Sequence, residues 1–165
     1  MAKVIYILGN DISTDIIYPG RYMATVLPTE TPQYAFADIP DLNKLLKEKS
    51  SSENFAIVAG DNFGCGSSRE QAASCLKGHN LIVIAKNFAR IFLQNAINLG
   101  LNVITCPEIE VNVNDEIEIK DTQILNLTTG KSFPIIPFPK TRQAIIDAGG
   151  LIPYTRKRML EERRK

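Results

Sequence analysis

The chain has 165 residues, of which 44% are hydrophobic and 22% are charged, and its net charge at pH 7 is +1. A chain of this length suits one ordinary domain, which removes roughly 70% of its unfolded surface from water and needs no disulfide or metal to fold. One His and three Cys, none in a C-x-x-C motif, exclude a zinc site built from the usual ligands and a complete set of disulfides.

The first 49 residues predict a strand, a long connection and a short helix. The apolar run within 3–8 suits a buried strand and is too short for a signal-peptide core or a membrane span, so we expect a cytoplasmic protein without a membrane anchor. The connection 9–41 contains four Pro, and a loop of that length in a compact domain is usually functional or disordered. The helix is predicted over 41–49.

Residues 55–105 alternate short apolar runs with helical patterns. The runs predict three buried strands, and the segments between them predict two helices, the second of which ends at Gly100. In chain order these elements are strand 55–59, helix 67–78, strand 81–85, helix 87–100 and strand 101–105. This β-α-β-α-β order implies a parallel sheet with right-handed crossovers.

The pattern changes after residue 106. Short, partly alternating runs separated by turn residues predict antiparallel strands, which we expect to form a second sheet. These runs are 110–113, 116–120, 123–127 and 133–137. A helix over 141–150 and a C-terminal helix follow, with Gly149 and Gly150 between them. The sequence therefore predicts a single α/β domain over 1–165.

The C-terminal segment 156–165 carries six basic and two acidic residues. A basic cluster is one signature of a nucleic-acid-binding patch. Met159, Leu160 and the spacing of the two Glu from the bases that follow them favour the solvated end of a helix instead. We predict no nucleic-acid partner.

The segment GDNFGCGSSREQA (60–72) lies between the end of a predicted parallel strand and the start of a predicted helix, where open α/β sheets bind ligands. Its glycines permit tight turns and close backbone approach, and its serines bring hydroxyls to the N–H groups of the helix start. Its arginine suits a carboxylate or a phosphate. The residues concerned are Gly60, Gly64, Gly66, Ser67, Ser68 and Arg69.

The same segment allows other interpretations, and for Ser67 taken alone helix capping is favoured. Ser67 to Glu70 spells S-x-x-E, a capping box in which Ser67 is the N-cap of the helix. Capping explains neither the glycines nor a cation in the first turn, where the helix dipole disfavours it, so Arg69 suggests a bound anion. A dinucleotide fingerprint would need Gly at position 69, and a phosphate loop would need Gly-Lys-Ser/Thr, so nucleotide binding is not predicted.

The sequence GDNFGCGSSREQA resembles the signature of the small subunits of 3-isopropylmalate dehydratase and of the aconitase swivel domain. The resemblance extends to three further blocks, which are GNDISTDIIYPGRY (9–22), IAKNFARIFLQNAINLGL (84–101) and DAGGLIPY (147–154). Four blocks in order cover nearly the whole chain and are more specific than one glycine loop. They imply a swivelling domain with three layers, β/β/α, built on a parallel core.

The resemblance implies a two-chain enzyme in which a large subunit carries a [4Fe–4S] cluster and this chain binds no cofactor. The implied reaction dehydrates and rehydrates a small hydroxy-dicarboxylate, as in the interconversion of 2- and 3-isopropylmalate in leucine biosynthesis. The alternatives are a related hydratase of the citramalate/citraconate, dimethylmalate or homoaconitase type, and a non-enzymatic carboxylate-binding module. The isolated chain could also form a homo-oligomer.

The resemblance also assigns roles by position. Ser67 matches the serine that, as an alkoxide, removes a proton from the carbon next to a carboxylate, and Ser68 matches its hydrogen-bonding companion. Arg69 matches the arginine that holds a substrate carboxylate. Asn62 and Asp15 match residues that support the site, and Asp15 is expected to orient a group across the subunit interface.

The segment 21–25 resembles the substrate-recognition loop of the family. Its residues are Arg21, Tyr22, Met23, Ala24 and Thr25. Homoaconitase-like members carry Tyr-Leu-Arg-Thr, whose Arg pairs with an additional carboxylate, and this chain has Ala24 at that position. A carboxylate buried there without a partner would cost about 2–5 kcal/mol, so we expect an alkyl substituent.

The three Cys have no predicted catalytic role. A thiol nucleophile at Cys65 would need His79, which stands at the end of a predicted helix with nothing to bring it close. Cys75 and Cys106 lie in apolar sequence and are predicted core thiols.

Overall fold

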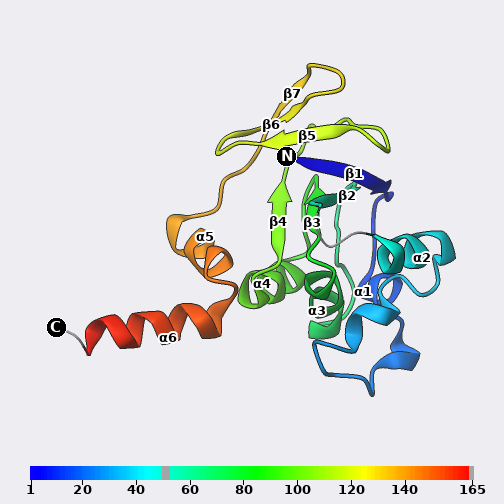
Figure 1. Cartoon of the computed structure of the whole chain (residues 1–165). Coiled ribbons are helices and arrows are strands. Elements are labelled where there is room, and N and C mark those ends of the chain that lie inside the picture. The colour runs from blue at the N-terminus through cyan, green and yellow to red at the C-terminus, as the bar shows by residue number, and fades with distance from the viewer. Residues whose placement is uncertain (50–52, 164–165) are drawn as a thin grey trace.

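The computed structural model describes residues 1–49 and 53–163 (Figure 1). Its strands are β1 (Ala2–Ile7), β2 (Phe55–Ala59), β3 (Ile82–Ala85), β4 (Asn102–Thr105), β5 (Glu116–Ile119), β6 (Gln123–Asn126) and β7 (Ser132–Pro134). Its α-helices are α1 (Thr14–Ile17), α2 (Pro40–Glu48), α3 (Glu70–Gly78), α4 (Arg90–Leu99), α5 (Lys140–Asp147) and α6 (Leu151–Glu162). Two 3-10 helices, η1 (Gly20–Tyr22) and η2 (Thr31–Tyr34), lie in the long connection after β1.

Within the described residues, seven strands form one hydrogen-bonded sheet in the order β4-β3-β2-β1-β5-β6-β7. Strands β1 to β4 pair in parallel, which confirms the predicted parallel core. The prediction of a second sheet is wrong, because β5 pairs antiparallel with β1, with Ala2 opposite Ile117, and so extends the same sheet. Strands β6 and β7 follow as antiparallel neighbours.

Alternate residues of β2 face opposite sides of this sheet. Ile57 and Ala59 belong to a buried cluster with side chains of α3 and α4, whereas Ala56 and Val58 belong to a second cluster. The second cluster also contains Ile117, Ile124 and Phe133, from β5, β6 and β7. One face of β2 therefore packs against the helices α3 and α4, and its other face packs against side chains of β5, β6 and β7.

Residues 110–113 do not form the predicted strand. They lead into a tight turn in which the N–H of Asn112 donates to the Asp115 carboxylate at 2.8 Å, and Asn114 takes a positive φ of 75°. The amide of Asn126 in β6 donates to the same carboxylate at 2.7 Å. Residues 112–115 therefore form a local turn, and 110–113 do not pair as a strand.

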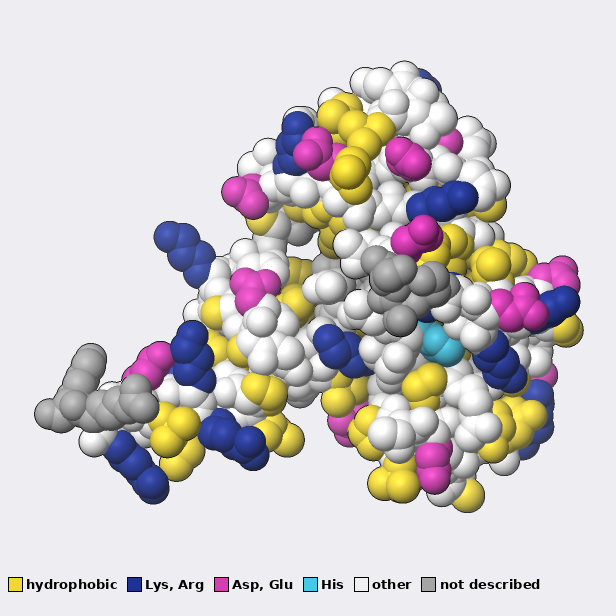
Figure 2. Space-filling view, in the orientation of Figure 1, with side chains coloured by type: hydrophobic (Ala, Val, Ile, Leu, Met, Phe, Trp, Pro, Cys, Tyr) yellow, Lys and Arg dark blue, Asp and Glu magenta, His cyan; other side chains and the backbone are white. Residues whose placement is uncertain are grey.

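The C-terminal helices agree with the sequence prediction. Gly100 ends α4 with a left-handed backbone, and Gly149 and Gly150 separate α5 from α6. Helix α6 projects from the domain, and Figure 2 shows hydrophobic and basic side chains along it. The last two basic residues of the predicted patch, 164 and 165, lie outside the described residues. Within residues 1–49 and 53–163, no helix is long and apolar enough to cross a membrane.

Candidate active site

The candidate site forms where β1 and β2 end and their two following segments continue side by side. The N–H of Asp11 donates to the carbonyl of Asp61 at 2.8 Å, and the N–H of Gly64 donates to the carbonyl of Ile12 at 2.7 Å. Further along, Ser13 and Cys65 form a parallel bridge. Backbone pairing therefore fixes the glycine loop (60–69) against residues 10–15.

Two glycines are required by the geometry of this loop. Gly64 has a φ of +82°, and a Cβ on it would lie 2.2 Å from the Cγ of Phe92 in α4. Gly66 has a φ of +99°, and a Cβ on it would lie 3.3 Å from the Oγ1 of Thr14. Residues with a side chain are disfavoured at both positions because of the positive φ, and at Gly64 also because of the contact with Phe92.

Ser67 lies in this loop and not in a helix. Its N–H donates to Thr14 Oγ1 at 3.1 Å, and its Oγ lies 3.1 Å from the same Thr14 oxygen. Helix α3 starts at Glu70, and the residue before it, Arg69, makes no side-chain capping bond. The capping-box interpretation of Ser67 is therefore wrong, because the tertiary contact with Thr14 holds the hydroxyl away from the helix start.

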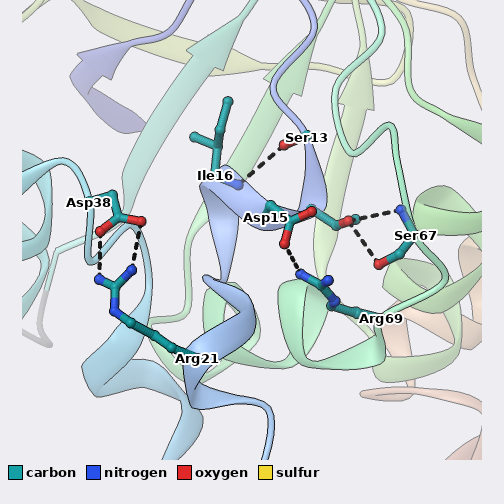
Figure 3. Close-up of polar contacts among 8 residues, drawn as sticks. Ser13, Asp15, Ile16, Arg21, Asp38, Ser67 and Arg69 are labelled. Carbon is teal, nitrogen blue, oxygen red and sulfur yellow. Dashed lines mark hydrogen bonds and ion pairs between the residues drawn. The ribbon is translucent and has the colours of Figure 1, made fainter.

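Arg69 forms an ion pair with Asp15 beside Ser67 (Figure 3). The expectation that Arg69 lies in the first helical turn is wrong, since it precedes α3. Its side chain is 19% exposed, whereas that of Asp15, in α1, is 60% exposed. A Cβ on Gly20 would lie 3.6 Å from both Arg69 Nη2 and Asp15 Oδ1, so the pair also lies beside Gly20, which precedes the predicted substrate-recognition residues 21–25.

The other two polar residues predicted for the loop do not contact this pair. Ser68 is exposed, and its carbonyl accepts a bond from Asn95 in α4 at 3.1 Å. The side chain of Asn62 donates to Asp11 at 2.8 Å, and its N–H donates to Asn87 at 2.7 Å. Asn62 therefore fixes the start of the glycine loop through Asp11 and Asn87, and it makes no contact with the Arg69–Asp15 pair.

The predicted substrate-recognition residues 21–25 lie within the segment 20–27, which we call the substrate segment after that prediction. The buried Tyr18 anchors this segment. The Tyr18 hydroxyl donates to the carbonyls of Tyr22 at 3.1 Å and Thr25 at 3.2 Å, and burial raises the pKa of Tyr18, so the donor proton is retained. The ring of Tyr22 stacks on that of Tyr34 with 4.1 Å between centroids. Ala24 is exposed, so the apolar part of this segment faces outward.

Arg21 is directed away from Arg69. Its guanidinium donates two hydrogen bonds to Asp38, at 3.0 and 2.5 Å (Figure 3). The same guanidinium lies over the ring of Tyr22. This bidentate contact lowers the pKa of Asp38 and raises that of Arg21. The structure thus places Arg21 on the outer side of the segment, where it fixes the position of Tyr22.

The structure places His79 and Cys65 at opposite ends of α3. The ring of His79 contacts the carbonyl of Pro32 at 2.8 Å, at the opposite end of α3 from Cys65. Cys75 and Cys106 are buried, as predicted, and burial raises the pKa of Cys106 to about 11. Among residues 1–49 and 53–163, no three His, Cys, Asp or Glu side chains are grouped to hold a metal ion.

Comparisons with known proteins agree with this geometry. Residues 10–108 match the family model of the aconitase C-terminal domain. The chain is 44% identical over 158 residues to the 3-isopropylmalate dehydratase small subunit of Methanosarcina acetivorans, covering 93% of this chain and 94% of that protein. The chain belongs to the family of 3-isopropylmalate dehydratase small subunits.

Other members of this family give the same result. The isopropylmalate/citramalate isomerase small subunit of Methanocaldococcus jannaschii is 43% identical over 159 residues, which is 93% of this chain and 92% of that protein. A crystal structure of 3-isopropylmalate dehydratase from the same organism matches with a TM-score of 0.87 and 36% identity, covering 99% of this chain and 96% of that chain. The resemblance of the four sequence blocks is therefore confirmed at the level of the family.

Several residues that build the site were not singled out from the sequence. Thr14 stands between Ser13 and Asp15 in a block that does resemble the family, yet nothing in the sequence shows that its hydroxyl is buried against Ser67. Tyr18 and Asp38 anchor the substrate segment through contacts that depend on the tertiary fold. The sequence indicates a role for these two residues only through their position in the proline-containing connection 9–41, which is predicted to be functional or disordered.

Proposed function

We propose that the chain is the small subunit of a two-chain cytoplasmic hydro-lyase that interconverts 2-isopropylmalate and 3-isopropylmalate in leucine biosynthesis. The observation that carries the proposal is that Ser67 lies next to the Arg69–Asp15 pair on a loop fixed by backbone pairing. The Ser67 hydroxyl does not cap helix α3, so it is available for chemistry. The printed names of relatives at 43–44% identity support the same class of reaction. The whole chain acts as one swivel domain in this proposal.

Ser67 is the proposed base. As an alkoxide, its Oγ takes a proton from the carbon next to a substrate carboxylate and becomes a neutral hydroxyl. The C–H electron pair becomes the second bond of the alkene, and the substrate hydroxyl leaves the neighbouring carbon as hydroxide with the C–O electron pair. A serine oxygen is a weak base, so this step depends on donors and cations around it. The guanidinium of Arg69, close in sequence and in space, supplies positive charge on this side of the site.

Arg69 is the proposed clamp for a substrate carboxylate. A guanidinium offers five donors in a planar fork, and the contact with Asp15 uses Nη1. Asp15 thereby sets the orientation of the fork and leaves other donors for the substrate. The exposed hydroxyl of Ser68 is proposed to add a hydrogen bond to the substrate, and Asn62 is proposed to support the loop from its base.

The partner in this proposal is a large subunit that carries the [4Fe–4S] cluster. The described residues of this chain do not fit a cluster, since Cys75 and Cys106 are buried and no ligand group is assembled. The steps assigned to this chain are therefore proton removal, carboxylate binding and contact with the substituent that distinguishes one substrate from another.

The substrate segment supports an alkyl-substituted malate. Met23 and Ala24 are exposed and uncharged, and neither could pair with an additional carboxylate. Citramalate is a second candidate, favoured by the 43% identity to an isopropylmalate/citramalate isomerase small subunit. Steady-state kcat/KM of the reconstituted complex on 3-isopropylmalate and on citramalate ranks these two substrates directly.

The assignment of the base is tested by Ser67→Ala in the complex with the cognate large subunit. We expect kcat to fall by about 10²–10⁴-fold, the range for loss of a general base, with unchanged thermal unfolding and subunit association. Ser132→Ala, on β7, is the matched control. Wild-type turnover in Ser67→Ala would refute the catalytic assignment.

The competing non-enzymatic function has its own test. Isothermal titration calorimetry of the isolated chain with 2-isopropylmalate should show weak or no binding, since half of the proposed site belongs to the partner. Tight binding without the partner, together with an inactive complex, would instead identify a carboxylate-binding module.

A further inference from the structure

We infer that Thr14 is a positioning residue for the proposed base, and that its hydroxyl donates a hydrogen bond to Ser67 Oγ when that oxygen is charged. The inference rests on the proposed function, because it assigns a partner to the proton-abstracting serine. Thr14 begins α1 and is 1% exposed, so its hydroxyl is shielded from bulk water.

The direction of the hydrogen bond follows from the donors available. A threonine hydroxyl has one hydrogen and two lone pairs. The N–H of Ser67 donates to Thr14 Oγ1 at 3.1 Å and occupies one lone pair, while Ser67 Oγ lies 3.1 Å from the same oxygen. Between two neutral hydroxyls either oxygen can donate, but an alkoxide has no proton and only accepts. In the reactive state, Thr14 is therefore the donor.

The donor is held in place before the reaction begins. The N–H of Thr14 donates to the carbonyl of Cys65 at 2.7 Å, and the Thr14 carbonyl accepts from the N–H of Tyr18 at 2.9 Å. Gly66, with its positive φ and no side chain, allows the loop to approach Thr14 Oγ1. A donor that is fixed in place before the reaction stabilises a developing negative charge without the cost of reorganisation.

A second buried pair of hydroxyls provides a matched control. Thr31 Oγ1 lies 3.1 Å from Ser74 Oγ, and the two residues are 0% and 8% exposed. This pair joins η2 to the middle of α3, away from the glycine loop. Removing the hydroxyl of Thr31 deletes a similar buried contact without touching the proposed base.

The experiment compares Thr14→Val, Thr14→Ser and Thr31→Val in the complex with the cognate large subunit, with 3-isopropylmalate and citramalate as substrates. For the better substrate, we expect Thr14→Val to lower kcat by about 10²-fold, the lower range for loss of one oxyanion donor, with KM nearly unchanged. Thr14→Ser keeps the hydroxyl and should restore kcat to within a few-fold of wild type. Thr31→Val should lower the melting temperature but leave kcat unchanged.

Coupling to the base separates positioning from general loss of structure. In a Ser67→Ala background, Thr14→Val should cause no further loss of kcat, because the two residues act on the same oxygen. If Thr14→Val fails to associate with the large subunit, Thr14→Cys replaces it, since a thiol is a weak donor of similar size and should also lower kcat.

The outcomes distinguish the two levels of the proposal. Wild-type kcat in Thr14→Val or Thr14→Cys, with an inactive Ser67→Ala, would overturn the role of Thr14 and leave the base assigned. An active Ser67→Ala would overturn the proposed base itself. An equal fall in kcat in Thr31→Val and Thr14→Val would show that the loss reflects stability and would also overturn the positioning role.

Discussion

The glycine loop and the substrate segment meet at Gly20, but the fold holds them in different ways. The loop is paired through its backbone with residues 10–15 and packs a glycine against Phe92. The substrate segment is held mainly by side-chain contacts, which are the Tyr18 hydroxyl, the stacked rings of Tyr22 and Tyr34, and the Arg21–Asp38 ion pair. Its apolar side chains are exposed, with Met23 at 42%, Val26 at 64% and Leu27 at 54%.

This difference separates two requirements of the proposed enzyme. Proton removal needs groups that are fixed in place, and the core of this chain fixes the position of the glycine loop. Selection of the substituent needs a surface that closes on the substrate, and an exposed apolar segment becomes such a surface when a second subunit covers it. Changes in the loop should therefore affect folding and turnover together, whereas changes in the segment should affect the choice of substrate.

The largest expected effect comes from Gly64→Ala. The positive φ costs about 1–2 kcal/mol for a residue with a Cβ, and the overlap with Phe92 adds about 1–3 kcal/mol of overpacking. We expect the free energy of unfolding, measured by urea denaturation, to fall by the sum of these two terms. The complex should also lose activity, because the loop that carries Ser67 must shift.

Gly130→Ala isolates the contribution of packing. Gly130 has a similar φ of +74°, and a Cβ on it would have no atom within 4 Å. This variant should lose only the backbone contribution and keep full activity. Equal destabilisation by Gly64→Ala and Gly130→Ala would show that the Phe92 side chain moves aside with no loss of stability. The glycine loop would then be less rigid than its backbone pairing indicates.

A smaller effect is expected from Ala24→Arg in the substrate segment. The added cation could pair with an additional substrate carboxylate, so kcat/KM for homoaconitate relative to 3-isopropylmalate should rise by about tenfold, or about 1.4 kcal/mol. Ala24→Gln has a polar side chain without charge and should leave that ratio nearly unchanged. The free energy of unfolding should not change, since the position is exposed. A ratio unchanged by Ala24→Arg would remove this segment from substrate selection.

The parts of the fold that could be predicted depend on local patterns. The parallel core follows from apolar runs and helix ends that are each contained in a few residues, and β2 has its predicted bounds. Whether the antiparallel strands extend the parallel sheet or form another one depends on the pairing of Ala2 with Ile117. No local sequence pattern indicates a pairing between residues so far apart in the chain. The antiparallel strands were therefore expected in the right region and assigned to the wrong sheet.

The site shows the same limit. Ser67 and Arg69 are predicted site residues because their motif is contiguous, but the local S-x-x-E pattern also predicts a cap that the structure does not form. The competing contact comes from Thr14, 53 residues away, and outweighs the local pattern. Roles that depend on such distant partners become visible only when the chain is folded.

The smallest predicted effect concerns His79, which links the two regions. It follows α3, the helix that leads from the glycine loop, and contacts the carbonyl of Pro32 in η2, the element whose Tyr34 stacks on the substrate segment. Burial lowers the pKa of His79 below its ordinary value of 6.5. As the pH falls below 6.5, the unfolded chain therefore binds a proton that the folded chain does not, and the free energy of unfolding decreases until the lower folded pKa is reached.

His79→Gln keeps a donor for the Pro32 carbonyl and removes the titration. Urea denaturation at pH 7.5 and pH 5.5 should show a larger loss of stability for the wild type than for the variant, by at most about 1.4 kcal/mol per pH unit for one proton. Groups that titrate elsewhere contribute equally to both proteins and cancel in the difference. Equal losses would mean that His79 accepts a proton as readily in the folded chain as in the unfolded one, and that the joint between α3 and η2 opens at little cost. In that case the substrate segment would be even more loosely held than its exposed side chains indicate, and the contrast with the glycine loop would widen.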